Sequence, residues 1–469
     1  MIKNFYDSRG VNTYISPLDD KQDGVILHAV NVDSQPIGAK TKRIGYASYL
    51  NNPDNAQVNS LWSFALDDGS TFFNYRASGS LIYYSAQGTG NWTICGNGTI
   101  SNGAHVGHAV LSDTMIVGDG VGSTRHTTDG TSFTNTTLAP IAAYFTEYQG
   151  RIHAQGTNTN FYSSANDATN WNTSGTSDSS SIEIPGGGRL LQSFKVADRL
   201  VLPKTTGEMY RWDGYSLVDL TTKFGPSTPY AYGETEGYKF YINRYGHFGY
   251  GGSQPELLSN AVQRQFYNAS GSAIVNNNIT TLPAETWYYD YLASVGTITD
   301  DFTDRTITNA LLKYDFQKNE YLNWQFADQP TAFHASIDSS GFEYLYFGDS
   351  SGNTYRMDPQ TTSDDGEAIN SELVFFFHFG APYYDKVWRW YRANTNPGCQ
   401  ARAQVATSDV FEYSRLVWHD LGDLKNGFVE YRFPDNSRSK FLFIRIYEAG
   451  TTSPWTFYGQ SIDAEVVKR

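Results

Sequence analysis

Short aromatic segments followed by the same kind of turn recur along this chain. In two of them a tyrosine-containing run passes through serine and small polar residues to a tryptophan: residues 82–92 are Ile-Tyr-Tyr-Ser-Ala-Gln-Gly-Thr-Gly-Asn-Trp, and residues 161–171 are Phe-Tyr-Ser-Ser-Ala-Asn-Asp-Ala-Thr-Asn-Trp. A repeat constrains the fold strongly, because each copy is one structural unit that buries its apolar faces against its neighbours.

The turn can be aligned at seven positions: Gly88, Asp129, Asp167, Asp213, Gly251, Asp315 and Asp358. Most of the intervals lie near the length of a four-stranded propeller blade, about 40 to 50 residues. The interval between Gly251 and Asp315 is longer, which predicts an insertion near residues 252–282. A loop of this length is a candidate contact surface.

Apolar and aromatic runs with a period of two precede the turns, and this period is typical of half-buried strands. The runs are Leu81–Tyr84, Asn160–Tyr162, Glu208–Trp212, His247–Tyr250, Leu311–Tyr314 and Asn353–Met357. A second run lies upstream of most turns, at Thr71–Phe73, Thr114–Val117, Arg151–His153, Arg199–Leu202, Lys239–Ile242 and Glu343–Tyr346. Each pair of runs predicts two neighbouring strands of one blade.

The sequence therefore predicts an all-β fold, a seven-bladed β-propeller followed by an antiparallel β-sandwich. The propeller is expected over residues 1–360, with a strand from 25–50 closing the ring in the last blade. The polar stretch 361–370 has the composition of a linker. Six or more short strands are expected in the sandwich over residues 371–469, among them Leu373–Phe377, Lys386–Tyr391, Ala401–Ala406, Val429–Phe433, Phe441–Tyr447 and Ile462–Val467.

Residues 127–133 and 164–171 look like degenerate copies of the Asp-box hairpin of sialidase-type propellers. In that family the aspartate and serine tie the turn through hydrogen bonds to the backbone, and the aromatic residue packs between blades. The likeness implies a structural role. We therefore expect the following residues to pack between blades: Trp92, Phe133, Trp171 and Trp212.

Composition excludes several classes of protein. The formal net charge of −14 argues against a broad basic surface that grips phosphates. No apolar run approaches the roughly 18 residues of a membrane span, so we expect a soluble chain without one. Cys95 and Cys399 lie in different predicted domains, so neither a disulfide framework nor a thiolate metal site is indicated.

Candidate chemical groups are few. His105 and His108 would suit one metal on a helix, but on a strand positions i and i+3 face opposite sides, which favours a structural role. Acidic residues gather at 300–304 and 364–367 without the spacing of a calcium loop. A propeller glycosidase would need an arginine cluster or paired carboxylates at its axis. The sequence does not indicate that Arg125, Arg199, Arg211 and Arg244 form such a cluster. We expect no catalytic, metal or cofactor-binding residue and no enzymatic activity.

Segments 10–17, 29–33, 38–46 and 251–259, together with Tyr84-Ser85 followed by Trp92, resemble propeller-type tail proteins of tailed bacteriophages. The relatives are the packaged-DNA stabilisation, tail hub or nozzle proteins of short tails. The resemblance implies a homo-oligomeric ring, often of six copies, in the virion tail below the portal and adaptor. It also implies synthesis in the host cytoplasm and contacts with other tail proteins. The ring would retain packaged DNA and let it pass at ejection without specific binding.

Aromatic residues are dense near the C-terminus, and interfaces are rich in such side chains. We expect candidate partner contacts at Trp388, Trp390, Trp418 and Trp455. The alternative is a carbohydrate-binding or sialidase-like propeller, in which such side chains stack on sugars.

Overall fold

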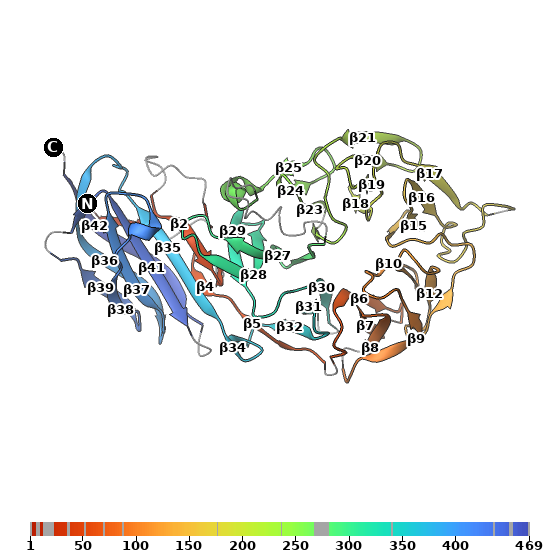
Figure 1. Cartoon of the computed structure of the whole chain (residues 1–469), viewed down its shortest axis with the longest axis horizontal. Helices are drawn as coiled ribbons and strands as arrows, with labels where there is room; N and C mark the ends of the chain where they lie inside the picture. Colours follow the sequence, from red (N-terminus) through yellow and green to blue (C-terminus); the bar gives the residue numbers. More distant parts are fainter. Residues whose placement is uncertain are drawn as a thin grey trace.

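The computed structural model describes residues 2–5, 10–12, 23–34, 38–50, 53–68, 71–86, 89–175, 177–235, 237–266, 281–338, 341–434, 437–449 and 454–467. The predicted turn at Gly88 and much of the predicted insertion, 267–280, lie outside them. The chain forms a ring of sheets with a second part, here called the two-sheet unit, beside it (Figure 1). Both chain ends lie at the side of the two-sheet unit that is remote from the ring (Figure 1).

Five four-stranded antiparallel sheets follow one another around the ring. Their strands are β6 (Val58–Ala65), β7 (Phe72–Ser78), β8 (Leu81–Ala86) and β9 (Thr93–Thr99); β10 (Gly107–Leu111), β11 (Thr114–Gly118), β12 (Arg125–Thr127) and β13 (Thr134–Asn135); β14 (Phe145–Tyr148), β15 (Arg151–Gln155), β16 (Thr159–Tyr162) and β17 (Ser180–Glu183); β18 (Phe194–Val196), β19 (Arg199–Pro203), β20 (Met209–Trp212) and β21 (Leu217–Thr221); β22 (Tyr232–Thr235), β23 (Tyr238–Asn243), β24 (Gly246–Tyr250) and β25 (Glu256–Leu257). The predicted aromatic runs supply the second and third strands of these blades, so the prediction of a β-propeller is confirmed.

A sixth blade contains a strand from near the N-terminus. Strands β30 (Ala332–Ile337), β31 (Glu343–Gly348) and β32 (Thr354–Asp358) are followed in space by β5 (Gly45–Ser48), with Tyr46 opposite Met357. Strands β33 (Ser363–Asp364) and β34 (Glu367–Ala368) extend this sheet beyond β5. The predicted linker at 361–370 is thus wrong, because Asp364 pairs with Tyr46 of β5 and β34 pairs with β33.

The described part of the chain has six free-standing blades, not the seven expected. The remaining place in the ring is filled by β26 (Ala284–Trp287), β27 (Asp290–Thr299), β28 (Thr306–Asp315) and β29 (Glu320–Gln325). This meander belongs to a nine-stranded sheet that continues through β2 (Val25–Val30) into β35 (Asn370–Phe377), β41 (Phe441–Ala449), β37 (Arg402–Ser408) and β38 (His419–Asp423). The meander does not end as a blade because β2 pairs with its outer strand, which would otherwise present unpaired backbone groups to solvent.

The second sheet of the two-sheet unit is built from both ends of the chain. It contains β3 (Val32–Asp33), β4 (Lys40–Lys42), β42 (Thr456–Val467), β36 (Asp385–Pro397) and β39 (Asn426–Arg432), with β1 (Ile2–Phe5) beside β42 and β40 (Arg438–Ser439) beside β36. The assignment of all of 1–360 to the propeller is therefore wrong for β1 to β4. β3 pairs with the nearby β4, but β1, β2 and β4 pair with strands hundreds of positions away, which no local pattern indicates.

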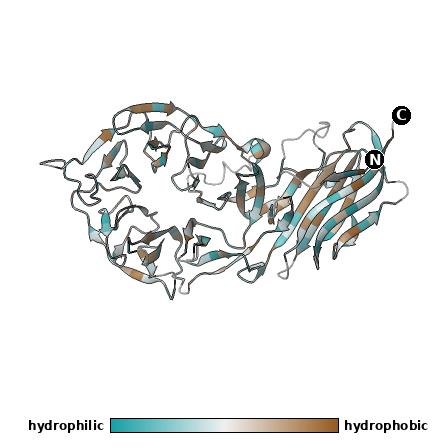
Figure 2. Cartoon of the chain, turned by 180° about the vertical axis from the view of Figure 1, so that it is seen from behind, coloured by the Kyte–Doolittle hydropathy of each residue, from teal (hydrophilic) through white to brown (hydrophobic). Residues whose placement is uncertain are grey.

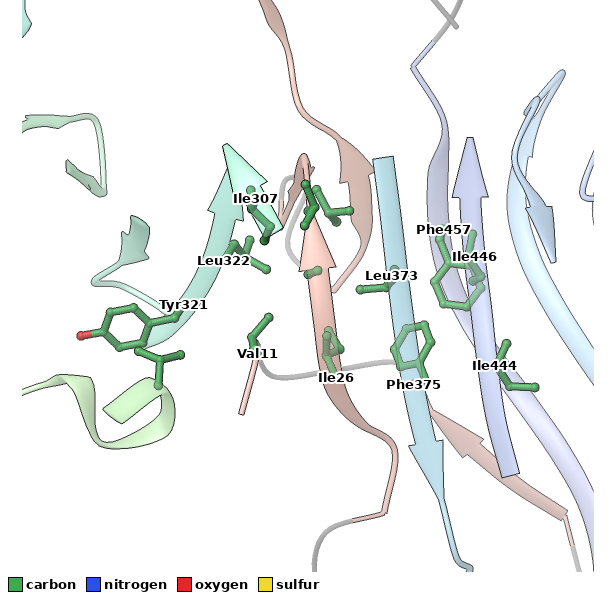
Figure 3. Close-up of a cluster of buried hydrophobic side chains, with 14 of the residues drawn as sticks. Val11, Ile26, Ile307, Tyr321, Leu322, Leu373, Phe375, Ile444, Ile446 and Phe457 are labelled. Carbon is green, nitrogen blue, oxygen red and sulfur yellow. The ribbon is translucent and has the colours of Figure 1, made fainter. Parts of the chain in front are cut away.

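One apolar core runs from the ring into the two-sheet unit. Ile26 of β2 lies between Leu322 of β29 and Phe375 of β35 (Figure 3). Across the unit, Phe375 packs against Phe457 of β42 with ring centroids 5.6 Å apart. Figure 2 shows hydrophobic and hydrophilic residues alternating along the strands of this unit, as expected for strands with one buried face.

The predicted insertion is partly folded onto this core. It contains one turn of 3₁₀ helix, η1 (Ser259–Val262), and one turn of α-helix, α1 (Gln263–Phe266). Val262 and Phe266 are fully buried and join the core shared by the two parts of the chain. The described residues of the insertion are thus held by apolar packing. A further short 3₁₀ helix, η3 (Tyr413–Arg415), lies on the two-sheet unit.

Candidate ligand site at the propeller axis

The innermost strands of the blades surround a cavity of about 400 Å³ on the propeller axis. Side chains from or next to β6, β10, β22, β26 and β30 line it, among them His105, His108, Tyr230, Glu285 and His334. A second cavity, of about 620 Å³, lies beside it among the connections between blades. Both volumes are in the range of ligand pockets, about 300 to 1,000 Å³.

A contact across the ring separates the two cavities. His105 precedes β10 in the second sheet along the chain, and Tyr230 precedes β22 in the fifth, yet their ring centroids lie only 4.2 Å apart. Tyr144, which precedes β14, lies 6.4 Å from Tyr230 by the same measure. Because His105 and Tyr230 line both cavities, their rings form a waist between them, and Tyr144 lines only the larger cavity.

Three histidines face the cavity, and burial keeps them uncharged at neutral pH. Burial lowers the pKa of His105 and of His334 to about 4, and that of His108 to about 3. His105 Nδ1 lies 3.0 Å from the carbonyl oxygen of Asn59, and His334 Nε2 lies 3.0 Å from Ser63 Oγ. His108 stacks on the ring of Trp62, with centroids 5.6 Å apart.

The expectation that His105 and His108 face opposite sides was wrong. β10 begins at Gly107, so His105 lies before the strand and the alternation of a strand does not apply to it. Both imidazoles therefore reach the same cavity. No group of three or more His, Cys, Asp or Glu side chains within the described residues is arranged to hold a metal ion.

The remaining ionisable groups of the cavity carry little net charge. Burial raises the pKa of Glu285 to about 7, although two backbone N–H groups, those of Thr286 and Ala335, donate to its carboxylate. Lys239 Nζ and Glu234 Oε2 form an ion pair of 2.9 Å at the edge of the cavity. Donors and acceptors without strong charge thus dominate this part of the axis.

The two acidic segments are used within the fold. Asp300 is fully buried and pairs with His28 at 2.8 Å, while its Oδ1 accepts hydrogen bonds from the backbone and hydroxyl of Thr303. Asp364 binds Arg43, and Asp365 accepts from the backbone N–H and hydroxyl of Ser48. Their oxygens therefore hold turns and strands together.

The aspartates of the blade turns bind the backbone. Asp129 Oδ1 accepts the N–H groups of Thr131 and Ser132, and Asp213 Oδ1 accepts those of Tyr215 and Ser216. The same turn recurs at Asp167, Asp315 and Asp358. Such side-chain bonds fix tight turns after a strand, which explains why the aspartates recur at blade spacing.

The four aromatic residues predicted to pack between blades are all buried in clusters that join two neighbouring sheets. Trp92 shares a cluster with Tyr49 and Tyr346, and Phe133 shares one with Trp62 and Met115. Trp171 belongs to the cluster of Ile116 and Phe145. Trp212 contacts Tyr148 of the preceding sheet. In each cluster residues of consecutive sheets meet.

The tryptophans of the two-sheet unit divide into two pairs. Trp388 and Trp455 have 1% and 0% of their surface exposed, so their predicted role as partner contacts is wrong. Trp390 and Trp418 are partly exposed. A β-bulge between Trp388 and Trp390 shifts the register of β36, which turns the second side chain away from the core that holds the first. The guanidinium carbons of Arg392 and Arg432 each lie 5.9 Å from the ring centroid of Trp390.

The four arginines considered from the sequence do not line the axial cavities. Arg125 donates to the backbone oxygens of Asn97 and Thr99, and Arg199 pairs with Asp213 at 3.1 Å. Arg211 and Arg244 contact the backbone of Gly252 and the ring of Tyr245. One arginine, Arg189, lines the larger axial cavity among the described residues.

Within the described residues, every helix is too short or too polar to span a membrane.

Comparisons with known proteins find solved structures of low similarity. No family model matches the sequence, and no curated protein matches it. YCF48 from Cyanidioschyzon merolae is 9% identical, with 67% of this chain and 99% of that one covered and a TM-score of 0.43. BamB from Moraxella catarrhalis is 10% identical, with 69% and 92% covered and a TM-score of 0.40. The Pan2 WD40 domain of Neurospora crassa is 8% identical, with 67% and 93% covered and a TM-score of 0.41.

Proposed function

We propose that this chain is a non-catalytic structural subunit of a tailed-bacteriophage virion, of the short-tail hub or nozzle type. Copies of it would form a ring below the portal and adaptor that retains packaged DNA and conducts it at ejection. The resemblance of the N-terminal segments and blade turns to that family supports the proposal. Within the same proposal, the two-sheet unit is a β-sandwich that meets neighbouring subunits or other tail proteins.

The observation that carries the proposal is the rigid connection between the propeller and the two-sheet unit. One nine-stranded sheet crosses from one part into the other. A buried ion pair reinforces the joint, with Lys40 Nζ of β4 3.0 Å from Glu320 Oε2 of β29. A second pair, Lys42 Nζ and Glu448 Oε2 at 2.7 Å, ties the two sheets of the two-sheet unit together. A subunit whose two parts cannot hinge keeps the geometry of a ring constant, which is what a conduit wall requires.

Closure of the axis bears on where DNA would pass. The contact between His105 and Tyr230 lies across the propeller, so a conduit would run between copies of the chain and not through one of them. The net charge of −14 would disfavour adhesion of DNA to the conduit wall.

Loss of the chain from particles tests this proposal. Particles made without it are expected to fill with DNA and then lose it, whereas wild-type particles retain DNA and contain the chain in a fixed ratio to the portal. Trp390→Ala is expected to fold normally and to reduce incorporation, because this partly exposed tryptophan lies on the outer face of β36. Tyr215→Ala, at a fully exposed blade turn, is the matched control and should incorporate normally. Mature particles that lack the chain and keep their DNA would contradict the proposal.

Carbohydrate binding is the second candidate, and the neutral axial cavity favours it. A sialidase-like activity has less support, because one arginine alone lines the described part of the axis.

A further inference from the structure

We infer that the axial cavity binds an uncharged polyhydroxy molecule of the size of a mono- or disaccharide. This inference deepens the carbohydrate-binding candidate by giving it a site. It does not depend on the virion role, because it concerns the interior of one propeller and not the surfaces at which copies would meet.

The shape of the cavity suits a small ligand. Its volume of about 400 Å³ is bounded on one side by the waist of His105 and Tyr230. Three aromatic residues, Tyr230, Tyr232 and Phe333, line it. Pyranose rings present apolar faces that pack on aromatic side chains, and their hydroxyl edges need donors and acceptors around them.

Unused hydrogen-bonding groups face the cavity. No hydrogen bond within the described part of the chain uses either ring nitrogen of His108, and none uses the side-chain amide of Gln192, although both residues line the cavity. A neutral imidazole offers one donor and one acceptor, and an amide offers two donors and an acceptor oxygen. Together they can bind adjacent hydroxyl groups, each of which both donates and accepts.

The charges around the cavity select against ions. The three imidazoles are neutral at pH 7, and Lys239 is already paired with Glu234. Glu285 ionises only near neutral pH. An anionic ligand would lose its hydration without gaining an unpaired counter-charge, and a cationic ligand would gain only the partly ionised Glu285. Hydroxyl groups instead exchange water for the protein's own donors and acceptors.

Calorimetric titration of the full chain with defined sugars tests the inference. The probes are glucose, galactose, mannose, N-acetylglucosamine, lactose and maltose, with glucuronic acid, glucosamine and N-acetylneuraminic acid as charged counterparts. At least one uncharged sugar is expected to bind with a Kd of about 1 mM or tighter. Its charged counterparts are expected to bind at least about tenfold more weakly.

Two variants assign the binding to the cavity. His108→Phe keeps a ring stacked on Trp62 and removes both nitrogens, and Gln192→Leu removes the amide without touching the histidines. Each is expected to weaken binding at least about tenfold with an unchanged melting temperature. His419→Phe, on the exposed outer strand β38, is the matched control and should bind as the wild type. Absence of binding by every uncharged sugar, equal binding of a charged counterpart, or wild-type affinity in a folded His108→Phe or Gln192→Leu variant would each overturn the inference.

Discussion

Arg43 Nη1 and Nη2 lie 2.8 and 2.5 Å from Oδ1 and Oδ2 of Asp364, a residue 321 positions later in the chain. The same guanidinium donates to Asn31 beside β2 and to the backbone oxygen of Gln325 in β29. Its carbon lies 4.7 Å from the ring centre of Phe326. One buried arginine thus joins the sixth free-standing blade, the meander of the nine-stranded sheet and the N-terminal segment.

Removal of this arginine is expected to destabilise the chain strongly. Arg43→Met leaves Asp364 buried without its counter-charge, and breaking a buried pair in this way costs about 3 to 5 kcal/mol. The free energy of unfolding in urea measures the effect. Arg389→Met is the control, because Arg389 and Glu465 are both more than half exposed and such pairs contribute less than about 1 kcal/mol. Equal losses in the two variants would show that the pair of Arg43 and Asp364 is not special.

The propeller and the two-sheet unit are expected to unfold together. They share one hydrogen-bonded sheet and one apolar core, so neither can lose its structure without exposing the other (Figure 3). Scanning calorimetry should give one transition whose calorimetric and van't Hoff enthalpies agree. Ile26→Asp, which places a charge in the core at β2, should lower the temperature of that transition. Two separate transitions in the wild-type chain would contradict this view.

Local patterns explain how much of this fold can be predicted. A blade is a run of neighbouring hairpins, so aromatic alternation and turn aspartates such as Asp129 and Asp213 mark its strands within a short window. The pairing of Val30 with Asn323 and Glu372 has no such signal, because its partners are distant in sequence. The seventh blade was expected for this reason, since β26 to β29 have the pattern of a blade and only β2 makes them part of a larger sheet.

The axial site was missed for a related reason. Tyr230 and His105 lie in connections between blades, and closure of the ring alone brings them to 4.2 Å. The pair of His105 and His108 was visible in the sequence, but the strand was expected to include His105. β10 begins only at Gly107. Gly103, which adopts a positive φ of 73° in the turn before the strand, was the available hint that the strand begins later.

Packing between blades is expected to depend on the buried tryptophans. Trp171 fills the space between the sheets of β10 to β13 and β14 to β17, and its Nε1 donates to the backbone oxygen of Ala168 at 2.9 Å. Trp171→Ala should lower the free energy of unfolding by about 3 to 5 kcal/mol through the cavity it leaves. Tyr215→Ala, at a fully exposed position, should change it by less than about 0.5 kcal/mol. If Trp171→Ala and Tyr215→Ala lower the free energy of unfolding in urea by similarly small amounts, Trp171 does not hold these blades together.

Acid is expected to destabilise the chain through its buried histidines, and His153 allows a clean test. His153 has none of its surface exposed, and burial, followed by the charge of Arg151, lowers its pKa to about 3. In the unfolded chain the pKa is about 6.5. Between these values the unfolded chain binds a proton that the folded chain does not, so the free energy of unfolding rises with pH across this window and becomes independent of this residue above it.

The size of the effect follows from the same window. For each pH unit below 6.5, His153 alone is expected to lower the free energy of unfolding by roughly 1.4 kcal/mol. Other buried histidines, such as His247, act in the same direction, whereas Glu285, whose raised pKa favours the protonated folded form, acts in the opposite one. Urea unfolding at pH 7.5 and pH 5.5 should therefore show a smaller difference for His153→Phe than for the wild type, by roughly 1.4 kcal/mol. His419→Phe, which alters an exposed histidine, should keep the wild-type difference, and an equal difference in all three proteins would exclude His153 as a source of the acid sensitivity.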